Sequence, residues 1–171
     1  MPDSDLTKNF LTSMRGVTST VTVISACSNQ ERHAMTATSV TSLSLNPPSM
    51  LVCVNKEASI HKILDKGSSF CINVLSNSQK QLAEICSNSD EGESRFQNNS
   101  WKKEDNFIFN EDSRSNILCE CINTIDHTSH TIYIGKVIKV LNDESKKSLL
   151  YGAGNYICLL YTSPSPRDWL Q

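Results

Sequence analysis

The strongest constraint on the fold is a series of strand-like segments, several of them joined by short polar connections. Six segments either alternate apolar with polar residues or form short apolar runs: 20–27, 34–45, 50–55, 69–75, 115–125 and 130–141. A two-residue period is typical of a half-buried strand, and short runs rich in Val and Ile are typical of a buried one. Many strands with few helices between them favour a closed antiparallel β-barrel.

Three segments have a helical pattern instead: 3–14, 56–67 and 78–86. In the first, Leu6, Phe10 and Met14 recur every four residues, which places them on one helix face. In the second, Gly67 is a typical helix end. These helices do not alternate with the strands as in a doubly wound sheet. We therefore predict a mainly β fold with a few peripheral helices.

Length and charge exclude several classes of protein. A chain of 171 residues suits one domain, which we expect over residues 5–157. The formal net charge of −2 lacks the basic surplus of a general nucleic-acid binder. No apolar run approaches the ~20 residues of a membrane span. The first residues, "MPDSDLTKNFL", have no export signal, so the cytoplasm is the expected compartment.

Two stretches depart from the pattern of the rest. Residues 87–114 are rich in Asn, Ser, Asp, Glu and Lys and predict a long surface excursion, a kind of loop that is often functional. Residues 158–171, "CLLYTSPSPRDWLQ", resemble translated sequencing-adapter sequence; the alternative is a genuine flexible tail. We draw no functional conclusion from this second stretch.

The cysteines predict packing rather than chemistry. There are seven, an odd number, and most fall within apolar strand-like runs. We interpret them as buried small hydrophobes and not as a disulfide framework. Cys119 and Cys121, followed by His127 and His130, could converge on a metal ion. Their spacing matches no common zinc module, in which two to four residues separate the thiols, so we predict no metal site.

A hydroxyl-rich stretch stands out among the predicted strands. Between residues 36 and 45 lie six hydroxyl side chains: Thr36, Thr38, Ser39, Thr41, Ser42 and Ser44. Pro47 and Pro48 then end the strand, because proline cannot donate to a ladder. Two interpretations remain open: a strand of good β propensity with one exposed side, or a wall that offers hydroxyls to a polar, planar ligand.

A second candidate lies where a buried strand passes into a predicted helix, in "LVCVNKEASIH" (51–61). The first turn of a helix has free N–H groups that attract phosphate. Lys56 adds positive charge there and Ser59 adds a hydroxyl. The alternative is a solvated lysine and an ordinary early-helix serine.

Together these pieces resemble a known family. The stretch "AMTATSVTSLSLNPPSMLVCVNKEASIH" (34–61) resembles the signature of flavin reductase-like, FMN-binding split-barrel proteins. The nearest likeness is to the reductase component of two-component flavin monooxygenases of the 4-hydroxyphenylacetate 3-monooxygenase type. Further matches follow in order: "FCINVLS" (70–76), "QLAEI" (81–85), "RF" (95–96), Trp101, "HTIYIGKV" (130–137) and "LLYGAGNY" (149–156). The resemblance implies a split β-barrel that forms a homodimer, with flavin near the subunit interface.

The resemblance also implies site residues, position by position. The flavin would lie against Thr36, Ala37, Thr38, Ser39, Val40 and Ser42. The next strand and the turn after it would contribute Cys53, Val54, Asn55, Lys56, Ala58 and Ser59. Phe96 matches a position that borders the flavin, and Tyr156 matches an aromatic at the pocket mouth. His130 matches a histidine near the nicotinamide and is the candidate for positioning it or supplying a proton.

The implied activity is hydride transfer from NADH or NADPH to FMN or FAD, with reduced flavin leaving for a separate monooxygenase. Because the flavin supplies the chemistry, the protein need only bind, orient and tune it. A flavin reductase of pyrimidine degradation is a close variant. Two other classes remain as alternatives: a flavin-binding electron carrier without nicotinamide turnover, and a β-barrel interaction module.

Overall fold

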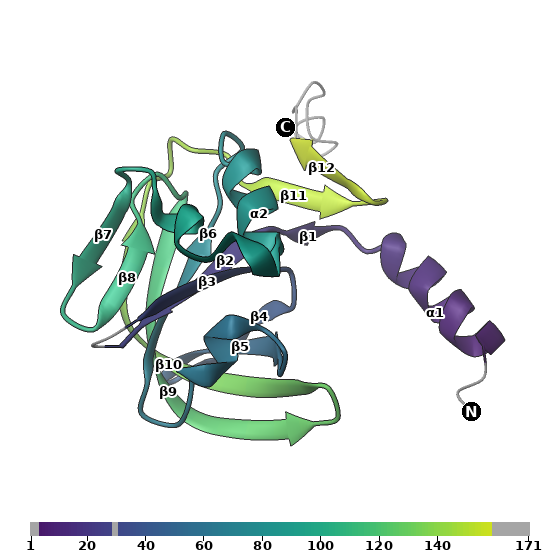
Figure 1. Cartoon of the computed structure of the whole chain (residues 1–171), viewed down its shortest axis with the longest axis horizontal. Coiled ribbons are helices and arrows are strands. Elements are labelled where there is room, and N and C mark those ends of the chain that lie inside the picture. Colours follow the sequence, from purple (N-terminus) through teal and green to yellow (C-terminus); the bar gives the residue numbers. More distant parts are fainter. Residues whose placement is uncertain (1–3, 29–30, 159–171) are drawn as a thin grey trace, which may run out of the picture.

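A seven-stranded antiparallel sheet forms the body of the molecule (Figure 1). The computed structural model describes residues 4–28 and 31–158. The sheet has the order β3-β2-β6-β9-β10-β5-β4. Its strands are β2 (Thr22–Cys27), β3 (Arg32–Ala37), β4 (Val40–Leu45), β5 (Pro48–Asn55), β6 (Ser69–Val74), β9 (Ser115–His127) and β10 (His130–Asn142). The prediction of a mainly β fold is confirmed.

Smaller elements surround this sheet. A three-stranded sheet contains β1 (Ser19–Thr20), β11 (Leu149–Gly152) and β12 (Asn155–Cys158). A separate hairpin contains β7 (Trp101–Glu104) and β8 (Phe107–Asn110). The helices are α1 (Ser4–Arg15), η1 (Ser59–Lys62), α2 (Lys80–Ser87) and η2 (Ser89–Phe96). Of the predicted tail, only Cys158 lies within the described residues.

The sheet curves until its two edges nearly meet. β3 and β4 are the edge strands, yet only Thr38 and Ser39 separate them in the chain. From Ala37 to Val40 the backbone can span roughly 11 Å at most. The barrel is therefore closed by ladders everywhere except at one seam, which residues 38–39 cross.

This seam corrects the prediction of a single strand over 34–45. β3 pairs with β2, whereas β4 pairs with β5 at the other edge. Thr22 Oγ1 donates to the Ala37 carbonyl (2.6 Å), and the Ser39 carbonyl accepts from the Cys53 N–H (3.1 Å). Alternation continues through both strands, so a two-residue period does not reveal where the chain changes its pairing partner.

The helix predicted over 56–67 is also wrong. Only η1 forms, a four-residue 3-10 turn. Asn55 Oδ1 accepts from the Glu57 N–H (3.0 Å), which makes a tight turn directly after β5. Ser68 closes a second turn through its hydrogen bonds with Asp65. Between these two turns the chain forms only the short η1.

Apolar side chains fill the barrel. Ile24, Val52, Phe70, Ile72 and Tyr133 belong to one fully buried cluster. All seven cysteines are free thiols and four of them are buried, as predicted for small core side chains.

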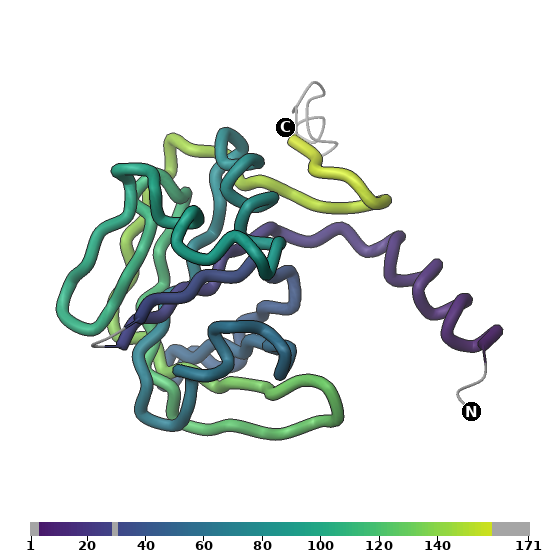
Figure 2. The backbone as a smooth tube through the Cα atoms, viewed as in Figure 1, coloured from purple at the N-terminus to yellow at the C-terminus, as the bar shows by residue number. Residues whose placement is uncertain are grey.

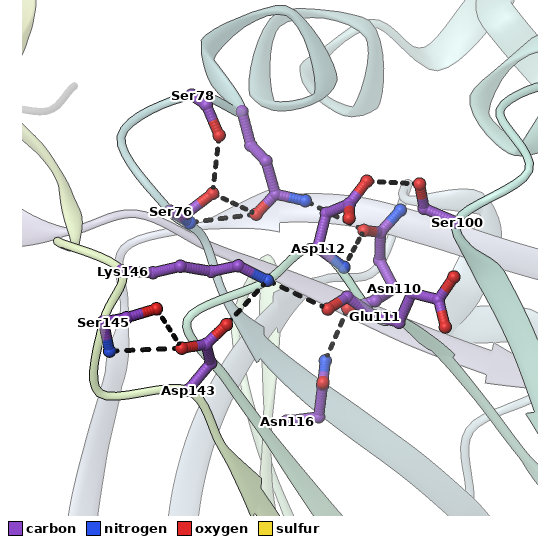
Figure 3. Close-up of polar contacts among 11 residues, drawn as sticks. Ser76, Ser78, Ser100, Asn110, Glu111, Asp112, Asn116, Asp143, Ser145 and Lys146 are labelled. Atoms are coloured by element: carbon purple, nitrogen blue, oxygen red, sulfur yellow. Dashed lines mark hydrogen bonds and ion pairs between the residues drawn. The ribbon is translucent and has the colours of Figure 1, made fainter.

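The predicted surface excursion at 87–114 contains η2 and the β7–β8 hairpin, and buried amides tie it to the sheet. Asn73 Oδ1 accepts from the Asn110 backbone N–H (2.8 Å) and from Asn116 Nδ2 (2.9 Å). Figure 3 shows Asn110 and Asn116 beside polar groups of the turn before β11, including Lys146, which contacts Asp143. The hairpin is therefore held rigidly against β6 and β9.

The first helix contrasts with the rest. α1 has no buried residue and extends away from the barrel (Figure 2). Its apolar side chains Leu6, Phe10, Leu11 and Met14 are all exposed. Among the described residues, no helix has the length and apolar character needed to cross a bilayer.

Candidate functional site

A cavity of about 400 Å³ lies beside β3, next to the seam. Its wall comes from β3, the start of η1, the α2–η2 junction and the β11–β12 hairpin. Six of the residues predicted to hold a ligand line it: Thr36, Ala37, Thr38, Ala58, Ser59 and Tyr156. The structure thus brings the hydroxyl-rich strand and the turn after β5 to one place.

A buried arginine dominates the charge of this cavity. Arg95 lines it, and only 5% of the residue is exposed. One terminal nitrogen, Nη1, donates to the Ala34 carbonyl (2.9 Å) and to Ser59 Oγ (3.3 Å), and Nη2 donates to the Asn88 carbonyl. Nε is buried and has no hydrogen-bond partner among the described residues.

The partners of Arg95 are uncharged oxygens, and no described carboxylate forms an ion pair with it. A buried charge without a counter-charge is costly, because burial removes its hydration. A guanidinium also matches the geometry of phosphate oxygens. The cavity is therefore suited to an anionic ligand, and a phosphate group fits this requirement.

Two tyrosines stand at the mouth of the cavity. The rings of Tyr151 and Tyr156 meet edge to face, with centroids 5.3 Å apart. Burial raises the pKa of Tyr156, and the nearby Glu84 raises it further. Burial also raises the pKa of Cys86, another lining residue, to about 12, although Arg95 opposes this shift. Both groups stay protonated at neutral pH, so this wall offers hydroxyl donors and no thiolate nucleophile.

The predicted hydroxyl wall is only partly available to a ligand. Thr36 Oγ1 donates to the Ala83 carbonyl (2.6 Å), and Ser39 Oγ donates to the Cys53 carbonyl (3.1 Å). Thr38 is exposed and lines the cavity together with two adjoining hollows. Val40 and Ser42 line one of these hollows, at the mouth of the barrel. Thr38 is therefore the point at which the three concave surfaces meet.

Other predicted site residues lie outside the cavity. Val54 is fully buried in the barrel core, and Cys53 contacts the seam through its backbone. The Asn55 side chain caps the turn that follows β5. Phe96 is buried against the Trp101 ring, with centroids 4.8 Å apart.

Lys56 and His130 also lie apart from the cavity. Lys56 forms an ion pair with Asp126 (3.4 Å) on the β9–β10 side. His130 pairs with Asn55 in the β5–β10 ladder, and its exposed ring contacts Ser129 Oγ (2.9 Å). Their ligand roles stay predictions.

Arg95 was not among the site residues predicted from the sequence. It lies in a polar stretch, directly before Phe96, and nothing in that stretch distinguishes a buried arginine from a solvated one. The only signal is its position within the "RF" pair that the family resemblance includes.

Of the metal candidates, the two thiols are packed into the sheet, whereas His127 and His130 are exposed. Cys119 and Cys121 are both buried, and burial raises the pKa of each thiol. In the stretches 4–28 and 31–158, no three His, Cys, Asp or Glu side chains gather as a metal site would require.

Known proteins share this architecture. Residues 14–158 match the family model described as the flavin reductase like domain. The chain is 37% identical to the reductase component of the FADH(2)-dependent resorcinol hydroxylase of Rhizobium sp. (strain MTP-10005), over 87% of this chain and 85% of that protein. It is 26% identical to the FMN reductase (NADH) RutF of Pseudomonas syringae pv. syringae, over 91% of this chain and 88% of that protein.

A solved structure agrees with these relatives. BorF, the flavin reductase component of a bacterial two-component tryptophan halogenase, superposes with a TM-score of 0.80 at 26% identity. The superposition covers 90% of this chain and 98% of BorF. The predicted split-barrel fold is confirmed, and the chain belongs to the flavin reductase-like family.

Proposed function

We propose that the chain is an NAD(P)H-dependent flavin reductase that supplies reduced FMN or FAD to a separate monooxygenase. The observation that carries this proposal is the uncompensated guanidinium of Arg95 in a cavity lined by hydroxyls and two tyrosines. The names of the relatives agree, since they include a hydroxylase reductase component and an NADH-dependent FMN reductase.

The residues present fit a flavin nucleotide. Arg95 and Ser59 would hold its phosphate, and Thr36, Ala37 and Thr38 would lie along the ring system. β3 is an edge strand, so one side of it carries backbone N–H and C=O groups outside the ladder. Such groups can bind the polar edge of the ring and favour its negatively charged, reduced form. The bound flavin would supply the hydride acceptor.

The protein would contribute positioning and not acid–base chemistry. Tyr156 and Cys86 stay protonated, so the wall of the cavity holds no strong base. His130 is proposed to orient the nicotinamide against the ring, as the family resemblance implies. For His130→Ala we expect a higher KM for NADH; unchanged NADH oxidation at every NADH concentration would remove this role.

One experiment separates the proposed function from its alternatives. The purified protein is incubated with NADH, and the absorbance at 340 nm is followed with and without added FMN or FAD. A reductase oxidises NADH only when flavin is present. A protein that binds flavin without turnover is an electron carrier, and one that does neither is an interaction module.

We also propose that α1 packs against a second copy of the chain. A helix of 12 residues needs tertiary packing to be stable, and α1 buries none of its residues. Leu11 and Met14 line the hollow that adjoins the candidate site at Thr38. A second copy seated there would cover the apolar face and complete the walls near the seam.

Light scattering tests this proposal. We expect the wild-type protein to have twice the mass of one chain and Phe10→Glu to shift it toward the monomer. Lys8→Glu is the matched control, because it introduces the same side chain into the same helix at a position outside the apolar face. A monomeric wild-type protein would contradict the proposal.

A further inference from the structure

We propose that three residues outside the cavity, Arg32, Phe96 and Trp101, form a clamp that positions Arg95 for the flavin phosphate. The inference rests on the proposed function, because it assigns a task to the same cavity. None of the three clamp residues lines the flavin cavity. They would therefore act through Arg95 and are positioning residues.

The first contact holds the backbone of Arg95. Trp101 Nε1 donates to the Arg95 carbonyl (2.9 Å). Trp101 lies at the start of β7, in the hairpin that buried amides fix to β6 and β9. The position of the Arg95 backbone is thus set by the rigid body of the sheet and not by its own loop alone.

The second contact holds the residue that follows Arg95. Phe96 is buried and packs against Trp101 on β7. The Arg32 guanidinium lies 4.4 Å from the centroid of the same Phe96 ring, a cation–π distance. Arg32 belongs to β3, the strand that also forms the cavity floor. The clamp therefore joins η2 to both β3 and β7.

An ion pair fastens the outer end of the clamp. Arg32 Nη2 lies 2.8 Å from Glu93 Oε2, and Arg32 Nε lies 3.1 Å from the same oxygen. Glu93 belongs to η2, two residues before Arg95. Gly92, with φ of +47°, makes the kink that brings this part of η2 toward β3.

The geometry explains how a distant contact can change phosphate binding. The Arg95 side chain has several rotatable bonds, and ordering it at the moment of binding would lower affinity. With its backbone held by Trp101 and its guanidinium held by the Ala34 and Asn88 carbonyls, that ordering is complete before the ligand arrives. Loosening the clamp restores this cost, and it does so only for ligands that contact the guanidinium.

The test compares FMN with riboflavin, which lacks the phosphate. Both are titrated without NADH, by flavin fluorescence, against the wild-type protein and Trp101→Phe. This substitution keeps an aromatic ring and removes the N–H donor. We expect the Kd for FMN to rise about 3- to 10-fold, as for one lost hydrogen bond, and the Kd for riboflavin to stay within about twofold.

A second variant and a control accompany this test. Arg32→Met removes the cation on the other side of Phe96 together with its ion pair to Glu93. We expect the affinity for FMN again to fall while that for riboflavin stays unchanged, but by less than in Trp101→Phe. Lys102→Met changes the neighbouring residue of β7, whose partner is Glu111, and should leave both Kd values unchanged. Thermal unfolding of each variant is recorded in parallel.

The outcomes separate the clamp from the proposed function. Two results would overturn the proposal and leave the clamp a purely structural contact. One is an equal loss of affinity for FMN and riboflavin, and the other is no loss of affinity in either clamp variant. A wild-type protein that binds FMN no better than riboflavin would overturn it too. Failure of the wild-type protein to oxidise NADH would overturn the proposed function, which the titrations do not measure.

Discussion

Two cations near the candidate site differ in almost every respect. Lys56 directly follows β5, is exposed, and pairs with the carboxylate of Asp126. Arg95 lies far along the chain in a polar excursion, is buried, and has only uncharged oxygens as partners. Lys56 was the cation predicted to hold phosphate, whereas Arg95 is the cation that we propose for this role. A buried cation without a counter-charge indicates an anion site better than does an exposed cation that follows a strand.

The absent helix removes one physical argument for phosphate binding by Lys56. An α-helix beginning after Asn55 would have aimed its free N–H groups and Lys56 toward one ligand. The 3-10 turn η1 spans only Ser59–Lys62 and aligns too few peptide dipoles for that effect. Ser59 lines the cavity and accepts a hydrogen bond from Arg95, and its role toward a ligand stays a prediction.

The largest expected effect removes the buried cation. Arg95→Met should raise the Kd for FMN about 30- to 100-fold, because charged hydrogen bonds contribute about 1.5–3 kcal/mol each. Riboflavin serves as the internal control, and its Kd should change little. Isothermal titration calorimetry gives both values. If Arg95→Met lowered the affinities for FMN and riboflavin equally, Arg95 would not be the residue that binds the phosphate.

A smaller effect concerns a hydroxyl of the cavity wall. Thr36→Val removes the partly buried hydrogen bond that joins β3 to the Ala83 carbonyl of α2. We expect the free energy of unfolding to fall by about 1–2 kcal/mol, as measured by urea denaturation. Thr41→Val, on the exposed strand β4, is the control and should change stability far less.

Replacing the exposed cation Lys56 should change flavin binding little. Lys56→Met is expected to leave the Kd for FMN within about twofold, because an exposed ion pair contributes at most about 1 kcal/mol and its partner is a carboxylate outside the cavity. The same calorimetric titration as for Arg95→Met applies. A loss of FMN affinity as large as that in Arg95→Met would contradict the expectation that Lys56 contributes little to flavin binding.

The smallest expected effect is a change in the pKa of Asp126. The hydrogen bond from Thr131 lowers the pKa of Asp126, and Lys56 lowers it further. NMR titration should show this pKa rise both for Thr131→Val and for Lys56→Met. Because the native pKa lies below the usual Asp value, any stability from Asp126 is present above that value and is lost as the pH falls.

Sequence patterns predicted the strands far better than the place where the chain changes its pairing partner. The segments expected at 115–125 and 130–141 became β9 (Ser115–His127) and β10 (His130–Asn142), because long alternating stretches depend little on context. The seam at Thr38 depends on which strands pair, which involves residues distant in the chain.

The burial of Arg95 was equally impossible to predict from the sequence. Its burial results from carbonyls on β3 and at the α2–η2 junction, which only the folded chain brings together. The hydroxyls of Thr36 and Ser39 looked alike in the sequence as ligand donors. Tertiary contacts decided that both donate within the protein.

The seam has a consequence for how such proteins diverge. Thr38 and Ser39 lie outside both edge strands, so no ladder hydrogen bond of the sheet depends on their side chains. Thr38 nevertheless borders three concave surfaces at once. A substitution at Thr38 would therefore alter all three surfaces at once without removing a ladder hydrogen bond of the barrel.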